Sequence, residues 1–526
     1  MARTMFHRTL ALLVIFSGLI LSACSAQHNL GEETWYQVDS ENFRIVTNGD
    51  PQAVETLARD LERYRAVALK LLGAEGARQE QQKLTIYATA DRQTYAGLVG
   101  AELAEMTNGL FDTTAQGSYA LVNLDGRSGT RQLQAREFLF HEYTHFLSYH
   151  GNTTHYPYWY SEGFAEFMST MTFPVPGRYK LGAVPEERAM TLLYASPMPI
   201  EQLLRATVMN TPNEEKPRVY ASGWMLAHWL IMESGKVEEF KDYVRAFNSG
   251  ADPVESLEST FGVKLADVEK RYEQLFQEGE FEMAGGIVPA EFREVTPDVR
   301  QLPPQRAIAE VGHFLVLSGY NLGGLDSLLQ YAHANGLMSA ELVAVQADAE
   351  TRMGNYEAAE RLLASVPVAE RSKFRYQHVD AWLGLTRQAN TTVDQRNREE
   401  LKKVRDKFVF LVNNDAETAS HWYGLAMSME MLDYPREKYL EMLEQAYLRA
   451  PRQVHIAQWM ARELYDKRDA EYFARVAEPL LMELNDEDQY QQMKLMLAEM
   501  KAEEEPGVKA RVDRTLASKA SEKNEG

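Results

Sequence analysis

The residues best suited to chemistry are two histidines four positions apart, His141 and His145, with Glu142 directly after the first. On a helix, positions i and i+4 project from the same face, so both imidazoles can bind one ion. A glutamate at this place does not bind the metal but takes a proton from the metal-bound water. The spacing therefore predicts a hydrolytic zinc site.

A buried helix with satisfied histidines is the alternative interpretation of this segment. The neighbours of the histidines are mostly apolar: Phe138, Leu139, Phe140, Tyr143, Phe146 and Leu147. Two histidines and a glutamate inside such a core would be costly without a strong partner. A metal ion would be such a partner, so we favour the metal site.

A hydrolytic zinc usually has a third protein ligand and one open position. Glu162, in the segment Trp-Tyr-Ser-Glu-Gly-Phe-Ala-Glu-Phe, is the candidate for the third ligand. Glu166 follows one helical turn later, and we expect it to accept a hydrogen bond from a ligand histidine. Two alternatives remain for Glu166, a solvated helix position and an exchange of roles with Glu162.

The combined pattern resembles that of the gluzincin metallopeptidases, in which a second helix carries the glutamate ligand, often within Trp-x-x-Glu-Gly-x-Ala. Trp159, Glu162, Gly163 and Ala165 match this motif. The chain looks most like the peptidase-MA-like gluzincins of bacteria, which implies Zn²⁺ as cofactor and hydrolysis of peptide bonds. The sequence has no Gly-x-Met-Glu-Asn segment of the kind that binds a free amino terminus, so we expect an endopeptidase.

Amide hydrolysis also needs a hydrogen-bond donor for the developing oxyanion. Tyr220, followed three residues later by Gly223, resembles the Tyr-x-x-Gly segment of aminopeptidase-type gluzincins, where the tyrosine hydroxyl has this role. Packing in the core is the alternative for a tyrosine that enters an aromatic helix. His150 and His155 have no helical register with the first histidine pair, so we expect them to be loop residues or at most to face the substrate.

The elements that must position these residues follow from hydrophobic periodicity. Alternating patterns predict strands at 42–48, 83–89 and 118–124, with a helix from Asp50 to Gly73 between the first two. From Gln132 the pattern is mostly helical. These elements predict an α+β fold for the first part of the chain.

Four prolines in a short stretch predict a linker at 286–306. Beyond it, the segments 341–367 and 421–451 both show helix, turn, helix and then proline, and they resemble tetratricopeptide repeats. Small residues lie where the paired helices would touch: Ala347, Ala359 and Ala446. An ordinary helical bundle is the alternative.

The first residues resemble a bacterial lipoprotein signal. A basic head and a short apolar run end in Leu21-Ser22-Ala23-Cys24, and Cys24 is the only cysteine. The resemblance implies cleavage before Cys24, lipid attachment there and anchoring to a membrane facing the periplasm. Ser25 is not the aspartate that usually retains lipoproteins in the inner membrane, so the outer membrane is favoured. A spare thiol and an intermolecular disulfide are the alternatives for Cys24.

Together these patterns predict the organisation of the chain. We expect a signal peptide at 1–23, an α+β metallopeptidase domain with a small sheet and zincin helices at 24–285, a linker at 286–306, an all-α helical-repeat domain at 307–502 and a disordered tail at 503–526. A formal charge of −21 argues against a nucleic-acid partner.

Two functions from different classes fit these expectations. The first is a lipid-anchored periplasmic zinc endopeptidase that acts on a protein or peptide, with the repeats binding substrate or a protein partner. The alternative is an envelope assembly or binding factor that acts through its repeats, with an inactive or structural zinc domain. Glu142 favours the enzyme, because a structural site has no use for a general base.

Overall fold

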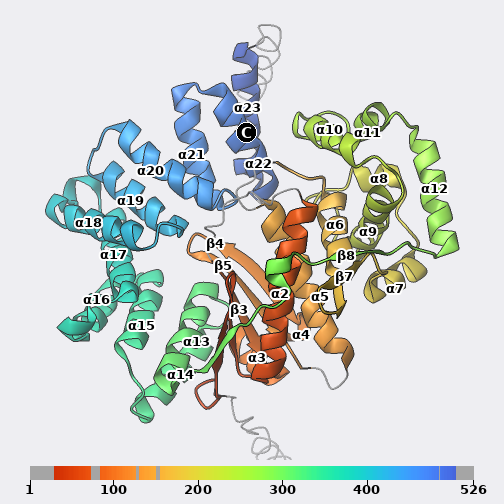
Figure 1. Cartoon of the computed structure of the whole chain (residues 1–526). Helices are drawn as coiled ribbons and strands as arrows, with labels where there is room; N and C mark the ends of the chain where they lie inside the picture. The colour runs from red at the N-terminus through yellow and green to blue at the C-terminus, as the bar shows by residue number, and fades with distance from the viewer. Residues whose placement is uncertain (1–28, 73–82, 126–128, 150–153, 485, 505–526) are drawn as a thin grey trace, which may run out of the picture.

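The structure is a computed structural model that describes residues 29–72, 83–125, 129–149, 154–484 and 486–504. A mixed sheet with its helices comes first, and a long succession of helices follows (Figure 1). The predicted order of an α+β part and an all-α part is confirmed at this level. The predicted signal segment, Cys24 and His150 lie outside the described residues, as does most of the predicted tail.

Six strands form the larger sheet, in the order β4-β5-β3-β2-β1-β9. β3 is parallel to both β2 and β5, and the remaining neighbours pair antiparallel. The predicted strands at 42–48, 83–89 and 118–124 are β2, β3 and β5. The strands span Tyr36–Asp39 (β1), Phe43–Thr47 (β2), Leu84–Thr89 (β3), Gly109–Thr114 (β4), Gly117–Asn123 (β5) and Asp298–Gln301 (β9).

Two long helices, α2 (Pro51–Leu71) and α5 (Gly129–Tyr149), pack on one face of this sheet. The Asp50 side chain caps the first turn of α2, as the sequence predicts. Tyr64 of α2 stacks on Phe140 of α5 with ring centroids 4.0 Å apart, and its hydroxyl donates to the Phe140 carbonyl oxygen at 3.0 Å. These contacts hold the histidine-bearing helix against the sheet.

The opposite face of the sheet packs against α3 (Arg92–Val99), α13 (Pro304–Ser318) and α14 (Leu322–Ala334). Phe314 of α13 contacts Tyr87 of β3 with ring centroids 4.4 Å apart. Residues on both sides of the predicted linker therefore share one hydrophobic core. The sequence analysis assigned these residues to two separate domains.

The segment predicted as a linker, 286–306, contributes to two sheets. β9 pairs with β1 at the edge of the larger sheet, and β8 (Ala284–Ile287) pairs with β7 (Arg178–Leu181) in a smaller one. Every residue of β9 is exposed, so the strand has no apolar alternation that a sequence could reveal. β9 lies at the edge of the larger sheet, where prolines next to a strand are tolerated.

The remaining elements before β8 are mostly helices, and β6 joins β7 and β8 in the smaller sheet, whose strand order is β6-β7-β8. They span Ala101–Met106 (α4), Tyr158–Ser169 (α6), Thr172–Val175 (β6), Glu186–Ala195 (α7), Ile200–Leu204 (α8), Lys216–Met232 (α9), Val237–Asn248 (α10), Pro253–Phe261 (α11) and Leu265–Glu278 (α12).

Helices α15 to α23 continue the chain as antiparallel neighbours. The two predicted helix-turn-helix units are α15 with α16 and α19 with α20, and the predicted contact alanines are fully buried. The helices span Ala340–Arg352 (α15), Tyr356–Ser365 (α16), Phe374–Ala389 (α17), Arg398–Asn414 (α18), Ala419–Met431 (α19), Arg436–Arg449 (α20), Val454–Lys467 (α21), Ala470–Glu483 (α22) and Glu487–Glu504 (α23).

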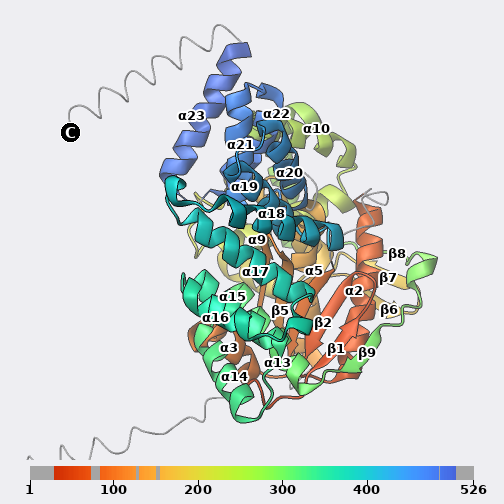
Figure 2. The same ribbon diagram turned by 90° about the vertical axis from the view of Figure 1, so that its left-hand side faces the viewer.

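These helices form an arc around the sheet. In Figure 1 the arc runs from α13 and α14 below the sheet, along its left side through α16 to α19, to α21 and α22 above it, next to the hairpin β4–β5. Figure 2 shows the same arrangement from the side, with α14 at the base and α21 and α22 at the opposite end. No described helix combines the length and apolar character needed to cross a membrane.

Candidate metal centre

Two histidines and one glutamate converge between α5 and α6. The Nε2 atoms of His141 and His145 lie 3.2 Å apart, and each lies 3.4 Å from Oε2 of Glu162. One ligand atom from each residue therefore falls within 4.8 Å of the other two. The structure thus brings together the three residues that the sequence analysis selected as metal ligands.

Two glycines of the sequence motifs bring α6 and α9 into close contact. A Cβ atom on Gly163 would lie 2.1 Å from the carbonyl oxygen of Gly223, and one on Gly223 would lie 2.4 Å from that of Trp159. Only glycine allows the two backbones to approach this closely. The contact holds Glu162, next to Gly163, beside the turn of α9 that carries Tyr220.

Glu166 lies behind His141, on the side away from the ligand atoms. Its Oε1 is 3.3 Å from Nδ1 of His141 and accepts a hydrogen bond from Nη2 of Arg188 at 2.8 Å. Glu166 is 5% exposed, so it is not a solvated helix position. A carboxylate at this place fixes the imidazole ring and its tautomer, with Nε2 left for a metal.

The charges of the site favour a cation. Burial opposes ionisation of Glu162, but the charge of His145 and the hydrogen bonds from both histidines hold its pKa well below the usual range. Burial likewise opposes ionisation of Glu166, yet His141 and Arg188 lower its pKa to about 2. Burial lowers the pKa of His141, but Glu166 and Glu162 outweigh it and raise the pKa to about 10. The carboxylates are thus ionised at neutral pH and attract positive charge to the point where the ligand atoms meet.

Glu142 has a different environment from the two other glutamates. Burial raises its pKa, although the two histidines act in the opposite direction. A raised pKa moves a carboxylate towards the range in which it exchanges protons near neutral pH. Its environment therefore suits a proton acceptor.

Tyr220 lies in the first turns of α9, close to the histidine pair. Its ring centroid is 6.2 Å from that of His141, and the Arg188 guanidinium lies 5.4 Å from the centre of the ring. Tyr158 shares a hydrogen bond with it. Burial and the nearby Glu162 raise the pKa of Tyr220, so its hydroxyl stays protonated and can donate a hydrogen bond.

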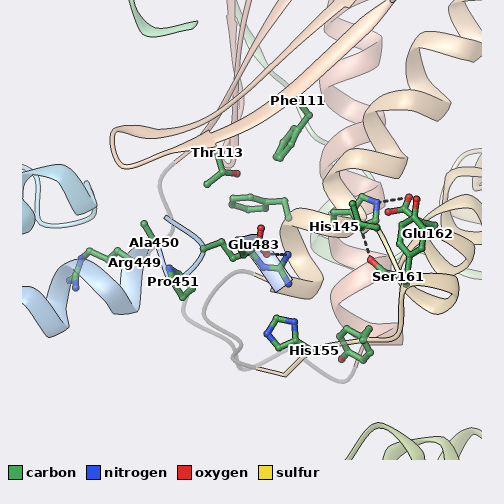
Figure 3. A pocket seen from close by; sticks show the side chains of 15 residues that line it. Phe111, Thr113, His145, His155, Ser161, Glu162, Arg449, Ala450, Pro451 and Glu483 are labelled. Atoms are coloured by element: carbon green, nitrogen blue, oxygen red, sulfur yellow. Dashed lines mark hydrogen bonds and ion pairs between the residues drawn. The ribbon is translucent and has the colours of Figure 1, made fainter. Parts of the chain in front are cut away.

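A cavity of about 460 Å³ opens beside the ligand residues (Figure 3). His145 and Glu162 form part of its lining, and His155 also faces it. Burial and the charge of Arg452 lower the pKa of His155 to about 4, so this imidazole is neutral at pH 7. His155 is not one of the three residues whose ligand atoms meet, and it lies in the lining of the cavity.

Sequence reasoning missed three contributors to the site. Arg188 holds Glu166, the Ser161 hydroxyl lies 3.4 Å from Nδ1 of His145, and the turn between α20 and α21 lines the cavity. Ser161 could have been found, because it directly precedes Glu162. The other two carry no local signal, since each reaches the site only through tertiary packing.

Comparisons with protein-family models, with curated proteins and with solved structures return no match for this chain. Its function must therefore be argued from its own residues.

Proposed function

We propose that this chain is a zinc-dependent metallopeptidase that hydrolyses peptide bonds in protein or peptide substrates, and that it is a gluzincin of the peptidase-MA-like kind. The observation that carries the proposal is the meeting of the ligand atoms of His141, His145 and Glu162 within 4.8 Å of one another. Two imidazoles and one carboxylate are a common ligand set of catalytic zinc, and they leave a position for water or substrate.

The donor atoms fit Zn²⁺ in type and in surroundings. Zinc accepts nitrogen and carboxylate oxygen ligands, and the contact of Glu166 with Nδ1 of His141 leaves Nε2 of that ring facing Glu162. The Nε2 atom of His145 also faces Glu162. When bound, zinc would act as a Lewis acid that makes a water nucleophilic and polarises the scissile carbonyl.

The remaining steps belong to the side chains of this protein. Glu142 accepts the proton of the attacking water and passes it to the leaving amine, a role that its raised pKa supports. Tyr220 donates a hydrogen bond to the oxyanion that forms on the scissile carbonyl. Glu166, held by Arg188, keeps the His141 ring in its orientation.

We further propose a place in the cell envelope. The lipobox-like sequence at Cys24 supports a lipid anchor on a membrane that faces the periplasm, preferably the outer membrane. The pairs α15 with α16 and α19 with α20 support a tetratricopeptide-like array that binds substrate or a protein partner.

The proposal is tested by metal analysis and by a digest of an unbiased peptide library. Wild-type protein should contain about one zinc and cleave the library, because the site offers three ligands. His145→Ala should lose zinc and activity, and Glu142→Gln should keep zinc and fold but lose nearly all cleavage, because an amide cannot accept the proton. His455→Ala, which removes an exposed histidine elsewhere, is the matched control and should keep both.

Two outcomes would contradict the proposal. Equal zinc in wild type and His145→Ala would exclude the ligand set, and equal cleavage by wild type and Glu142→Gln would exclude Glu142 from the reaction. Stoichiometric zinc without cleavage of any peptide would instead favour the binding or assembly factor with a structural zinc.

A further inference from the structure

The cavity beside the metal centre is built from two distant parts of the chain (Figure 3). One wall comes from α5 and α6, the loop between them, strand β4 and Val208, which lies between α8 and α9. The other wall comes from the turn between α20 and α21 and from the end of α22. This second wall consists of Arg449, Ala450, Pro451, Arg452 and Glu483.

Backbone contacts fasten the second wall to the sheet. The Gln453 side chain donates to the carbonyl oxygen of Thr113 at the end of β4. The Ser420 backbone N–H donates to the carbonyl oxygen of Ala115, in the turn between β4 and β5, at 2.7 Å. The turn that carries Arg452 directly precedes Gln453, so the bond to Thr113 ties this wall to β4.

The two arginines of the second wall have different surroundings. Arg449 packs over the Trp422 ring at 5.1 Å and donates to the Ala416 carbonyl oxygen, and in Figure 3 it points away from the metal ligands. It therefore braces the turn. Arg452 instead pairs with Glu483 at 2.9 Å, and both side chains are about 30% exposed, at 31% and 29%.

The size and lining of the cavity define what can enter it. A volume of about 460 Å³ suits a few residues of an extended peptide, whereas a folded domain is too large. Much of the lining is apolar or aromatic, which suits hydrophobic side chains near the scissile bond: Phe111, Phe146, Tyr156, Tyr158, Val208, Ala450 and Pro451. The Arg452–Glu483 pair is a polar group that can select one side chain.

An acidic side chain fits this pair better than a basic one. The guanidinium has five N–H donors in a planar fork, so an arginine that already has partners such as Glu483 can still contact the carboxylate of a ligand. A basic side chain would find only a carboxylate that is already paired, and Arg452 and a bound zinc would repel it. Burial raises the pKa of Glu483, although Arg452 acts in the opposite direction. The raised pKa makes Glu483 a weaker competitor for the guanidinium of Arg452.

We propose that Arg452 is a specificity-determining residue, which binds an acidic side chain of an extended peptide whose scissile bond lies at the metal centre. This inference rests on the proposed peptidase function and narrows its substrate to unfolded segments that carry an aspartate or glutamate. The C-terminal helices then take part in substrate selection at the active site itself.

Peptide binding to an inactive variant tests the inference apart from catalysis. The probes are fluorescein-labelled decapeptides in matched pairs, identical except for glutamate or glutamine at one scanned position, added to zinc-loaded full-length Glu142→Gln protein. At one position the glutamate peptide should bind about tenfold more tightly than the matched glutamine peptide, as expected for a hydrogen-bonded charge pair. Adding Arg452→Gln should reduce this ratio to about one, whereas adding Glu483→Gln should keep or increase it.

Two further variants serve as a control and as a conservative substitution. Arg398→Gln removes an arginine that pairs with Asp433 at 2.8 Å, outside the cavity, and should leave the ratio unchanged. Arg452→Lys keeps the positive charge but lacks the planar guanidinium, so it should lower the ratio. This variant tests the inference even if Arg452→Gln does not fold. Zinc content and melting temperature check the folding of each variant.

The possible failures are distinguishable. If no position prefers glutamate, or if the preference persists in Arg452→Gln, the specificity role is refuted even when wild-type protein cleaves peptides. If the preference depends on Arg452 but wild-type protein cleaves none of the decapeptides, the binding subsite is supported and the peptidase function is refuted.

Discussion

The contact between Gly163 and Gly223 should be the most sensitive point of the site to a small substitution. In Gly163→Ala the new Cβ atom would lie 2.1 Å from the carbonyl oxygen of Gly223 and 2.2 Å from its carbonyl carbon. Non-bonded heavy atoms prefer about 3.5–4.0 Å, so α6 and α9 must separate by roughly 1–2 Å. Both clashing atoms belong to the backbone, so no side-chain rotation can relieve them.

We expect this separation to reduce stability and activity together. Overpacking of this kind costs about 1–3 kcal/mol of unfolding free energy. Glu162 is next to Gly163 and Tyr220 is one turn before Gly223, so the proposed metal ligand moves relative to the proposed oxyanion donor. A misplacement of about 1 Å lowers turnover about a hundredfold. Chemical denaturation and peptide turnover, measured on the same preparation, give both quantities.

A matched glycine provides the control for this experiment. In Gly323→Ala, on the exposed side of α14, the nearest atom to the new Cβ is Oδ1 of Asn321 at an ordinary 3.6 Å. This variant should keep its activity and change stability by at most about 1 kcal/mol in the favourable direction. If Gly163→Ala has the same stability and turnover as the wild type, the view that close packing of α6 on α9 sets the geometry of the site is refuted.

The further predictions concern three single side chains. Tyr220→Phe should lower turnover about a hundredfold or more with little change in substrate affinity; a normal rate would leave Tyr220 as a core residue. Zinc binding to zinc-free protein at pH 7 should release about one proton, because His141, whose pKa is raised to about 10, must lose its proton to bind. Calorimetry in buffers of different ionisation enthalpy counts this proton, and Glu166→Gln should lower the count. Because the folded-state pKa of His141 is raised, its contribution to the stability of zinc-free protein is complete below pH 6.5 and is lost as the pH rises through about 10. Cys24→Ala should abolish labelling by a fatty-acid probe, and continued labelling would refute the lipobox interpretation.

The parts of the fold that local sequence patterns specify were predicted well. β2, β3 and β5 are central strands with apolar residues, and the capped start of α2 was identified from Asp50. β1 and β9 were missed because each has only four residues, too few to show a clear apolar alternation, and β9 at the edge is exposed along its whole length. The packing of α13 on the second face of the sheet was missed for a different reason. An amphipathic helix reveals which of its faces is buried but not which partner buries it.

The same distinction applies to the candidate site. His141, His145 and Glu162 lie within a short stretch of chain, and each spacing has a direct geometric meaning on a helix, so their meeting could be anticipated. Arg188 and the turn at Arg452 reach the site through the folding of whole elements. No periodicity connects them to the histidines, and only the structure reveals their proximity.

The return of the helical arc to the sheet has a consequence for how the cavity is maintained. Each helix pair of such an array is positioned mainly by its neighbours, so the place of a distant pair depends on every pair before it. Here the array begins in the shared core around α13 and ends with Gln453 bonded to β4. An inserted or deleted pair would therefore carry the turn before Gln453 away from the metal-binding helices. The number of helix pairs is thus constrained by the cavity beside the candidate metal centre, whereas an array without such a contact can gain or lose pairs without altering a distant site.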